Sequence, residues 1–269
     1  CNKDDFWKSL LEGKSGAKTI DFLDVDKLPV KFSASVKDFQ SDKYFDKKDL
    51  KKMDLFMQYG MAAGIDAVAD AKLLESQCNP DRIGVSIGSG IGGLYNIENT
   101  RDTFIKSGSR RISPFFVPAS IINMISGNLS IKYGFKGPNL SIVTACTTGT
   151  HNIGEGFRQI QYSHADVMIC GGAEMATSDL GVGGFAAARA LSTRNDSPET
   201  ASRPWDKDRD GFVLGDGAGV IVLEELEHAK KRGAKIYAEI NGYGMSADAY
   251  HMTLPVSYTH LTLPTTKNV

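Results

Sequence analysis

The 269-residue sequence has few cysteines, no long apolar run and almost no excess charge. Its four cysteines, Cys1, Cys78, Cys146 and Cys170, have no CxxC spacing and no nearby histidine pattern, which argues against a disulfide framework or a zinc site. No apolar stretch approaches the roughly 18–20 residues that cross a bilayer. The formal net charge of -1 gives no reason to expect nucleic acid or a membrane as partner. We expect a cytoplasmic globular protein with free thiols and neither metal nor cofactor.

The order of predicted elements indicates an α/β fold. Apolar periodicity predicts helices over residues 6–11, 47–74, 94–105, 114–133, 147–163 and 225–232. Short apolar runs predict strands over residues 82–86, 140–145, 166–170, 217–224 and 235–242, the third of them ended by Gly171 and Gly172. Strands that alternate with helices are typical of layered α/β proteins.

Residues 256–269, VSYTHLTLPTTKNV, depart from this pattern. They show neither helical nor strand periodicity, and they resemble a translated sequencing adapter. We expect a non-native tail and exclude it from the fold prediction. A disordered natural tail is the alternative.

Two glycine motifs match known functional patterns without their required context. The segment from Gly84 to Gly88 reads GxSxG, but Ser86 is predicted inside a strand and not on the sharp turn of a hydrolase. The glycines that follow satisfy GxGxxG, yet no acidic residue occurs in 108–113, where a dinucleotide site would need one. We predict instead that these glycines let backbone segments pass closely beside a cavity.

Cys146 is the candidate nucleophile. An apolar strand is predicted to stop at Ala145 and a helix to begin just after Cys146. The positive end of a helix dipole and its free N–H groups favour a thiolate, and small neighbours leave room for a substrate. The alternative is a buried cysteine that acts only as a small hydrophobic residue. His151, five residues along the helix, is on another face and is a poor base for this thiol.

The segment TACTTGTHNIG around Cys146 resembles the nucleophile motif of β-ketoacyl-[acyl carrier protein] synthases of the KAS II type. The resemblance covers residues 5–255, and so many motifs in one order are highly specific. Matching segments are LLEGKSG (10–16), IGSGIGG (87–93), ISPFFVP (112–118), CGGAE (170–174), GVGGF (181–185), ALSTR (190–194), RPWD (203–206), DGFVLGDG (210–217) and DAYHMT (248–253).

The resemblance implies a thiolase-like fold, layered αβαβα and built from two similar halves. Residues 1–233 would form the N-terminal half and residues 234–255 the start of the second. The opening strand and most of the second half are expected to be absent, so the fold would be truncated.

The resemblance also implies a transferase of fatty acid biosynthesis. Cys146 would accept an acyl chain as a thioester, with its backbone N–H as one oxyanion donor. Malonyl-[acyl carrier protein] would then lose carbon dioxide and attack that thioester. The two histidines that assist this step belong to HGT and GH motifs, and none of the five histidines here matches either. We therefore expect an active parent protein and a chain that alone cannot condense.

By the same matching, Ile91 would border the acyl pocket, Phe116 would reach it from the partner subunit of a homodimer, and Phe185 would lie near its mouth. Ordinary core packing is the alternative for both phenylalanines.

A basic patch on the helix predicted from residue 47 would meet the acidic acyl carrier protein. Its members are Lys48, Lys51 and Lys52, and Arg189 resembles another docking residue. A solvated charged face is the alternative, although a basic patch can steer an acidic partner.

Two other functions remain open. A polyketide ketosynthase would use related chemistry, and its extension products would tell it apart. A non-catalytic acyl-binding or dimerisation module would keep the fold without acylating Cys146.

Overall fold

The computed structural model describes residues 3–251. The chain divides into two units, with the boundary between residues 237 and 238 of the sequence. The first unit contains every helix and strand of the described chain, whereas residues 238–251 form neither. No helix in the described part of the chain is both long enough and apolar enough to cross a membrane.

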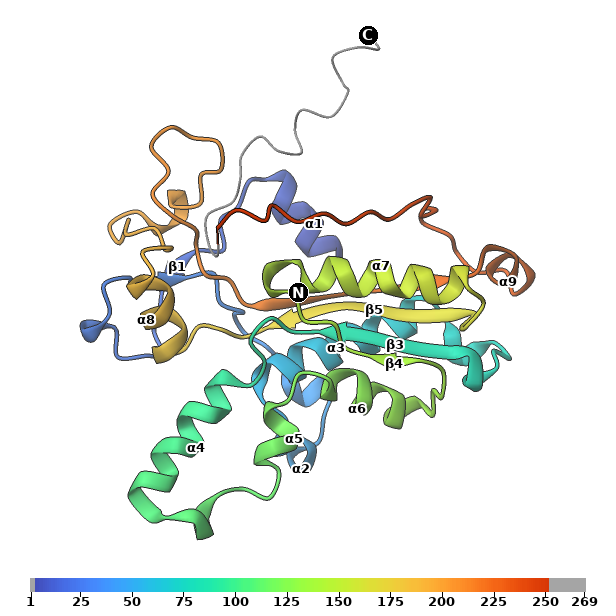
Figure 1. Ribbon diagram of the computed structural model, residues 1–269, viewed down its shortest axis with the longest axis horizontal. Coiled ribbons are helices and arrows are strands. Elements are labelled where there is room, and N and C mark those ends of the chain that lie inside the picture. The colour runs from blue at the N-terminus through green and yellow to red at the C-terminus, as the bar shows by residue number, and fades with distance from the viewer. Residues whose placement is uncertain (1–2, 252–269) are drawn as a thin grey trace. The chain divides into compact units, whose positions relative to one another are not determined.

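A four-stranded sheet lies at the centre of the first unit (Figure 1). Its order is β4 (Asn139–Leu140), β3 (Ile83–Gly88), β5 (Val167–Glu174) and β6 (Gly217–Glu224). The first three strands are parallel, and β6 is antiparallel to β5. All of β3 is buried, as expected for a parallel strand covered on both faces.

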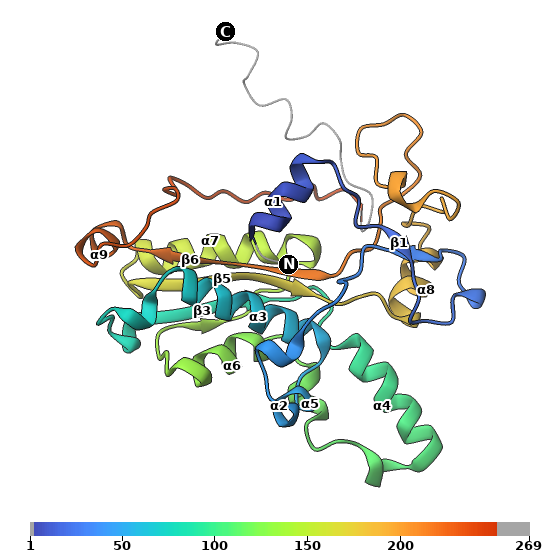
Figure 2. The same cartoon turned by 180° about the vertical axis from the view of Figure 1, so that it is seen from behind.

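Helices cover both faces of this sheet, as Figures 1 and 2 show. α3 (Leu55–Asp70) and α6 (Met124–Tyr133) pack on one face, and α7 (Thr148–Gln161) packs on the other. The largest core cluster lies between α3, α6 and the sheet, and includes Phe56, Met57, Val85, Ile87, Ile125, Leu129, Val167 and Ile169. This three-layer arrangement confirms the predicted α/β class.

Smaller elements surround the sheet. The other helices are α1 (Lys3–Leu11), α2 (Lys47–Leu50), α4 (Leu94–Ser107), α5 (Phe116–Ser120), α8 (Asp179–Ala187) and α9 (Leu226–Lys231). A separate antiparallel pair joins β1 (Lys18–Thr19) to β2 (Phe32–Ser33). The sequence patterns did not predict β1, β2 or α8.

Two of the predicted long helices are wrong, because each is divided. The segment 47–74 contains α2 and α3, and Asp54 caps the second by accepting from the Phe56 N–H. That cap requires an extended residue at position 54, which interrupts the helix. The segment 114–133 contains α5 and α6, separated where Ile121 takes an extended conformation.

Three strand predictions are also wrong. The strand over 140–145 is limited to β4. The strand over 166–170 does not end at its glycines, because β5 continues to Glu174. A Cβ at Gly171 would collide with the carbonyl oxygen of Gly219 on β6, so this glycine permits close strand pairing. Residues 235–242 form no strand. The strand 217–224 is confirmed, and the tail 256–269 lies outside the described residues.

Candidate active site

Cys146 lies in a single 3₁₀ turn (Ala145–Thr147) directly before α7. Its side chain is exposed. The prediction of a strand-to-helix junction is right about the helix, which begins at Thr148, and wrong about the strand, because β4 ends at Leu140. The preceding residue, Ala145, has a φ of 52°. A residue with a Cβ is strained in this left-handed region, and such strain is common beside reactive groups.

Asn152 determines the path of the chain before Cys146. Its amide is fully buried on α7. The amide oxygen accepts from the Ile142 N–H (3.0 Å) and the Ser86 hydroxyl (2.8 Å), and the amide nitrogen donates to the carbonyls of Ile142 (2.9 Å) and Thr148 (2.7 Å). The Asn152 side chain thus binds both the N–H and the C=O of Ile142. These groups cannot also pair with a neighbouring strand, and β4 therefore ends before Ile142.

The glycine-rich turn between β3 and α4 lies against this segment. A Cβ at Gly88 would collide with the carbonyl of Ile142, and one at Gly90 would lie 3.3 Å from the carbonyl oxygen of Ala145. A Cβ at Gly93 would lie 2.6 Å from the Cα of Ser120. These distances confirm the predicted close approach of backbone segments. Ser86, in the GxSxG match, is buried within β3 and is no exposed nucleophile.

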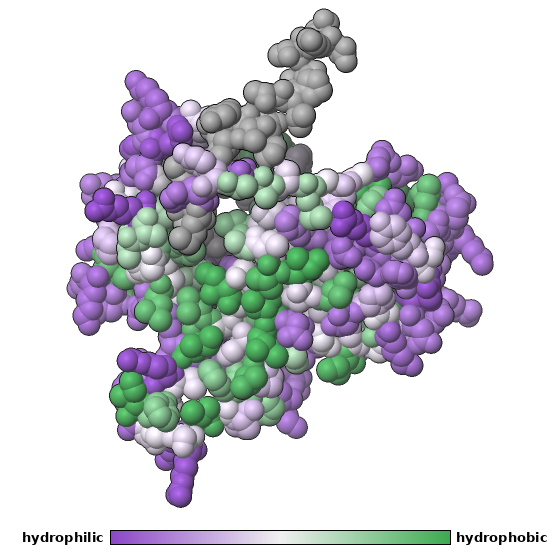
Figure 3. All heavy atoms as spheres, viewed as in Figure 1, coloured by the Kyte–Doolittle hydropathy of each residue, from purple (hydrophilic) through white to green (hydrophobic). Residues whose placement is uncertain are grey.

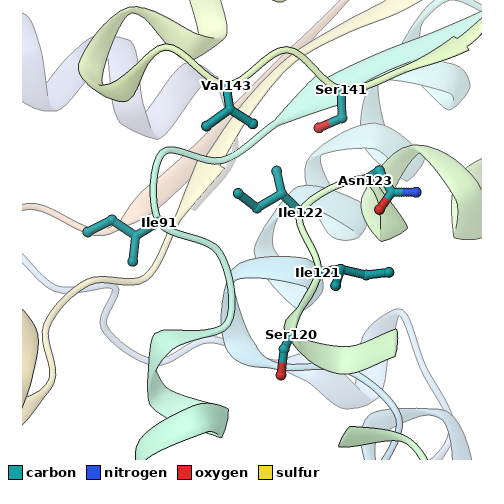
Figure 4. A pocket seen from close by; sticks show the side chains of 7 residues that line it. All are labelled: Ile91, Ser120, Ile121, Ile122, Asn123, Ser141 and Val143. Carbon is teal, nitrogen blue, oxygen red and sulfur yellow. The ribbon is translucent and has the colours of Figure 1, made fainter. Parts of the chain in front are cut away.

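An open pocket of about 410 Å³ borders the same turn (Figure 4). Its lining residues are Ile91, Ser120, Ile121, Ile122, Asn123, Ser141 and Val143. Ile91 is 38% exposed and Val143 is 47% exposed, so both leave apolar surface open beside the segment that leads to Cys146. Figure 3, drawn in the view of Figure 1, shows apolar side chains gathered across the centre of the molecule's visible face. Ile91 thus lines an open pocket of apolar and small polar side chains, and its contact with an acyl chain stays a prediction.

The two phenylalanines lie elsewhere in this chain. Phe116 is half-buried in α5 and does not line the pocket. Phe185 is half-buried in α8 and packs edge-to-face on Phe212, with ring centroids 5.2 Å apart. Phe185 belongs to a second apolar cluster around Val182 and Leu191.

The basic residues lie on two separate segments. Lys48 is on α2, whereas Lys51 and Lys52 are in the turn after it, so they do not share one long helix. Lys48 and Lys51 are exposed. Lys52 pairs with Asp49 at 2.6 Å and lies 5.9 Å above the Phe115 ring. Arg189 is exposed and follows α8.

The other described cysteines differ from Cys146. Cys170 is fully buried in β5, and this burial raises the pKa of its thiol. Cys78 is half-buried in a loop. Within residues 3–251 no three histidine, cysteine or acidic side chains are grouped as metal ligands would be.

Comparison with known proteins assigns the chain to a family. The model of the β-ketoacyl synthase N-terminal domain matches residues 1–229. The chain belongs to the β-ketoacyl synthase family. The chain is 61% identical over 249 residues to 3-oxoacyl-[acyl-carrier-protein] synthase 2 of Vibrio cholerae, covering 93% of this chain and 60% of the relative. It is 59% identical to the protein of the same name from Coxiella burnetii, covering 93% of this chain and 61% of the relative.

Solved structures agree with this assignment. A β-ketoacyl synthase from Burkholderia phymatum superposes with a TM-score of 0.86 at 33% identity, covering 94% of this chain and 62% of that structure. A type II polyketide ketosynthase, solved with its acyl-carrier protein, gives 0.80 at 29% identity, covering 94% and 61%. The predicted KAS II resemblance and thiolase-like fold are confirmed. The chain spans about 60% of the length of the curated relatives it matches.

Proposed function

We propose that this chain carries the acyl-accepting part of a β-ketoacyl-[acyl carrier protein] synthase of fatty acid elongation. The observation that supports this most directly is the exposed Cys146 thiol, in the turn before α7, next to a segment that lines an apolar pocket. The Cys146 sulfur attacks the carbonyl carbon of a carrier-bound thioester. A new S–C bond forms, the bond to the carrier thiol breaks, and that thiol leaves with a proton.

The neighbouring groups support this step in distinct ways. The backbone N–H of Cys146 stabilises the oxyanion, and Ile91 borders the acyl chain in the pocket. Phe116 of a partner subunit completes the pocket in a homodimer, and Phe185 lies near its mouth. The exposed lysines Lys48 and Lys51, together with Lys52 and Arg189, receive the acidic acyl carrier protein in the cytoplasm.

Condensation needs groups that this chain does not contain. None of its five histidines lies in an HGT or GH motif, and these are the motifs that would assist decarboxylation of malonyl-[acyl carrier protein]. We expect the 269-residue chain to take up acyl groups but not to release a β-ketoacyl product.

Acyl transfer is tested by incubating the purified chain with acyl-[acyl carrier protein] and measuring its intact mass. We expect a gain of one acyl group at Cys146, located by peptide mass, and no gain in the Cys146→Ser variant. A chain that binds the acyl carrier but gains no mass would be a binding module instead. A β-ketoacyl product after addition of malonyl-[acyl carrier protein] would contradict the expected lack of condensation.

The similarity to a polyketide ketosynthase (29% identity) supports polyketide chain extension as a second candidate reaction. Because the fatty acid relatives are 59–61% identical, we favour fatty acid elongation. Extension products from the complete gene product and one defined primer separate the two, since a polyketide enzyme retains keto groups through repeated rounds.

A further inference from the structure

One carboxylate, that of Glu174 at the end of β5, organises the turn between β3 and α4. It accepts from the Ser89 hydroxyl at 2.6 Å and from the Gly90 N–H at 2.8 Å. The Ile91 N–H lies 3.1 Å from one carboxylate oxygen and 3.3 Å from the other. The Ser89 hydroxyl in turn accepts from the Gly92 N–H at 3.0 Å. The backbone of the whole turn is thus arranged around this side chain.

This turn touches both parts of the candidate site. A Cβ at Gly90 would lie 2.6 Å from a Glu174 oxygen and 3.3 Å from the carbonyl oxygen of Ala145. Gly90 is therefore enclosed between the carboxylate and the residue that precedes Cys146. The next residue, Ile91, lines the pocket (Figure 4). A shift of the turn would move the pocket wall and loosen the backbone beside the thiol.

We propose that Glu174 is a positioning residue: it holds Ile91 at the pocket edge and so sets which acyl chain lengths reach Cys146. Hydrogen bonds to an ionised carboxylate are about twice as strong as neutral ones. Without it, the Ser89 hydroxyl and two backbone N–H groups lose their common acceptor, and the turn loses its fixed position. This role rests on the proposed function only in taking the pocket as the place of the acyl chain.

Three variants separate positioning from general stability. Glu174→Gln keeps the shape of the side chain, but its NH₂ group would face backbone donors. Ser89→Ala removes one donor to Glu174 and the acceptor of the Gly92 N–H. It leaves the Gly90 and Ile91 contacts to the carboxylate in place, so we expect a smaller effect on the position of Ile91. Glu225→Gln is the matched control. Glu225 accepts from the His228 N–H at 2.6 Å, and it follows the end of β6 that pairs with the start of β5, remote from Glu174.

Two readouts are compared in the complete gene product. The first is the rate at which carrier thioesters of short and long chains acylate Cys146. The second uses N-alkyl iodoacetamides of matching lengths, which need no carrier: the sulfur forms a bond to carbon, iodide leaves, and the thiol proton passes to buffer. Peptide mass assigns the modified cysteine. We expect the wild-type ratio of long-chain to short-chain rates to change at least fivefold in Glu174→Gln, less in Ser89→Ala, and not in Glu225→Gln.

Hydrogen exchange of the Gly90 and Ile91 amides checks the route of the effect, and we expect faster exchange in Glu174→Gln. An unchanged rate ratio, an equal change in Glu225→Gln, or a changed ratio with unchanged exchange would each overturn the positioning role. So would a wild-type protein whose alkylation does not depend on chain length. If carriers fail to acylate Cys146 while the alkyl reagents give the expected series, the positioning role stands and the proposed reaction falls.

Discussion

At the scale of single residues, Cys146 and Cys170 carry the same thiol in opposite environments. Cys146 is exposed in the turn before α7, whereas Cys170 is buried in β5, where burial raises the pKa of its thiol. Because the thiolate is the reacting species, burial removes both access and reactivity from Cys170. Position in the fold, and not residue type, decides which of the two thiols a reagent in solution can reach.

This difference predicts selective alkylation by iodoacetamide. In the native chain we expect Cys146 to react at least roughly 100-fold faster than Cys170, which reacts only when β5 opens. Peptide mass mapping over time measures both rates, and urea should abolish the difference. Cys146→Ser is the control for non-specific labelling. Comparable native rates for the two thiols would show that β5 does not shield Cys170.

At the scale of secondary structure elements, the packing of α7 on β5 depends on one glycine. A Cβ at Gly156 would collide with the Cys170 sulfur and lie 3.4 Å from the Cβ of Met168. α7 approaches the sheet this closely only because position 156 has no side chain. The same helix has a glycine with more room: a Cβ at Gly149 would lie 3.6 Å from its nearest neighbour, the Gly172 nitrogen.

A double-mutant cycle tests this contact. Gly156→Ala gains up to about 1 kcal/mol of helix propensity, but overpacking costs about 1–3 kcal/mol, so we expect net destabilisation. In the Cys170→Ala background the sulfur is gone, and Gly156→Ala should become neutral or stabilising. Urea denaturation measures all four free energies of unfolding, with Gly149→Ala as a tolerated control. Equal effects of Gly156→Ala in both backgrounds would rule out the contact with sulfur.

The elements also show which features a sequence pattern can predict. The strand 217–224 was predicted with its observed bounds. A short apolar run is visible in the local sequence, without knowledge of contacts to distant residues. The strand over 140–145 was wrong because the amide of Asn152 takes the backbone groups of Ile142, a contact that periodicity does not encode. The break between α2 and α3 is different: Asp54 is a recognisable capping residue, so this division could have been predicted.

Some residues of the candidate site could be named from the sequence, whereas others are recognised only in the structure. The family motif predicted roles for Cys146 and Ile91, which lie in the turn before α7 and at the pocket. It gave no role to Asn152 or Glu174, although both shape the backbone around the site. Glu174 is more than 80 residues from Ser89 and Gly90 in the sequence. The pairing of β3 with β5 brings these residues together.

At the scale of the whole molecule, buried carboxylates link distant segments and give stability an expected pH dependence. Glu224, at the end of β6, accepts from Arg232 at 2.6 Å, and Arg232 also donates to the Ala71 carbonyl after α3. The side chains of this pair are only 8% and 12% exposed. Burial alone would raise the pKa of Glu224, but hydrogen bonds from Arg232 and His228 outweigh it and lower that pKa below 4.5.

Asp54 has the opposite shift. It is buried at the start of α3 and accepts from the Asn96 N–H at 2.7 Å. Burial is the larger effect and raises the pKa of Asp54 above its ordinary value of 3.8, despite hydrogen bonds from backbone N–H groups. The folded chain therefore takes up a proton at Asp54 more readily than the unfolded chain, and this group favours folding as the pH falls toward 3.8.

These opposite shifts predict how two variants change the acid response. The stabilisation from Glu224 is present above pH 4.5 and is lost as the pH falls through its lowered pKa. Glu224→Gln should cost about 3–5 kcal/mol at pH 7, because it leaves Arg232 buried without its partner. It should also flatten the further loss of stability below pH 4.5. Asp54→Asn removes a group whose protonation stabilises the folded chain, so stability should fall more steeply as the pH falls from 7 toward 3.8. Urea unfolding across this range measures both slopes, and a Glu224→Gln variant with the wild-type slope below pH 4.5 would show that this carboxylate does not link acid stability to the Arg232 contact.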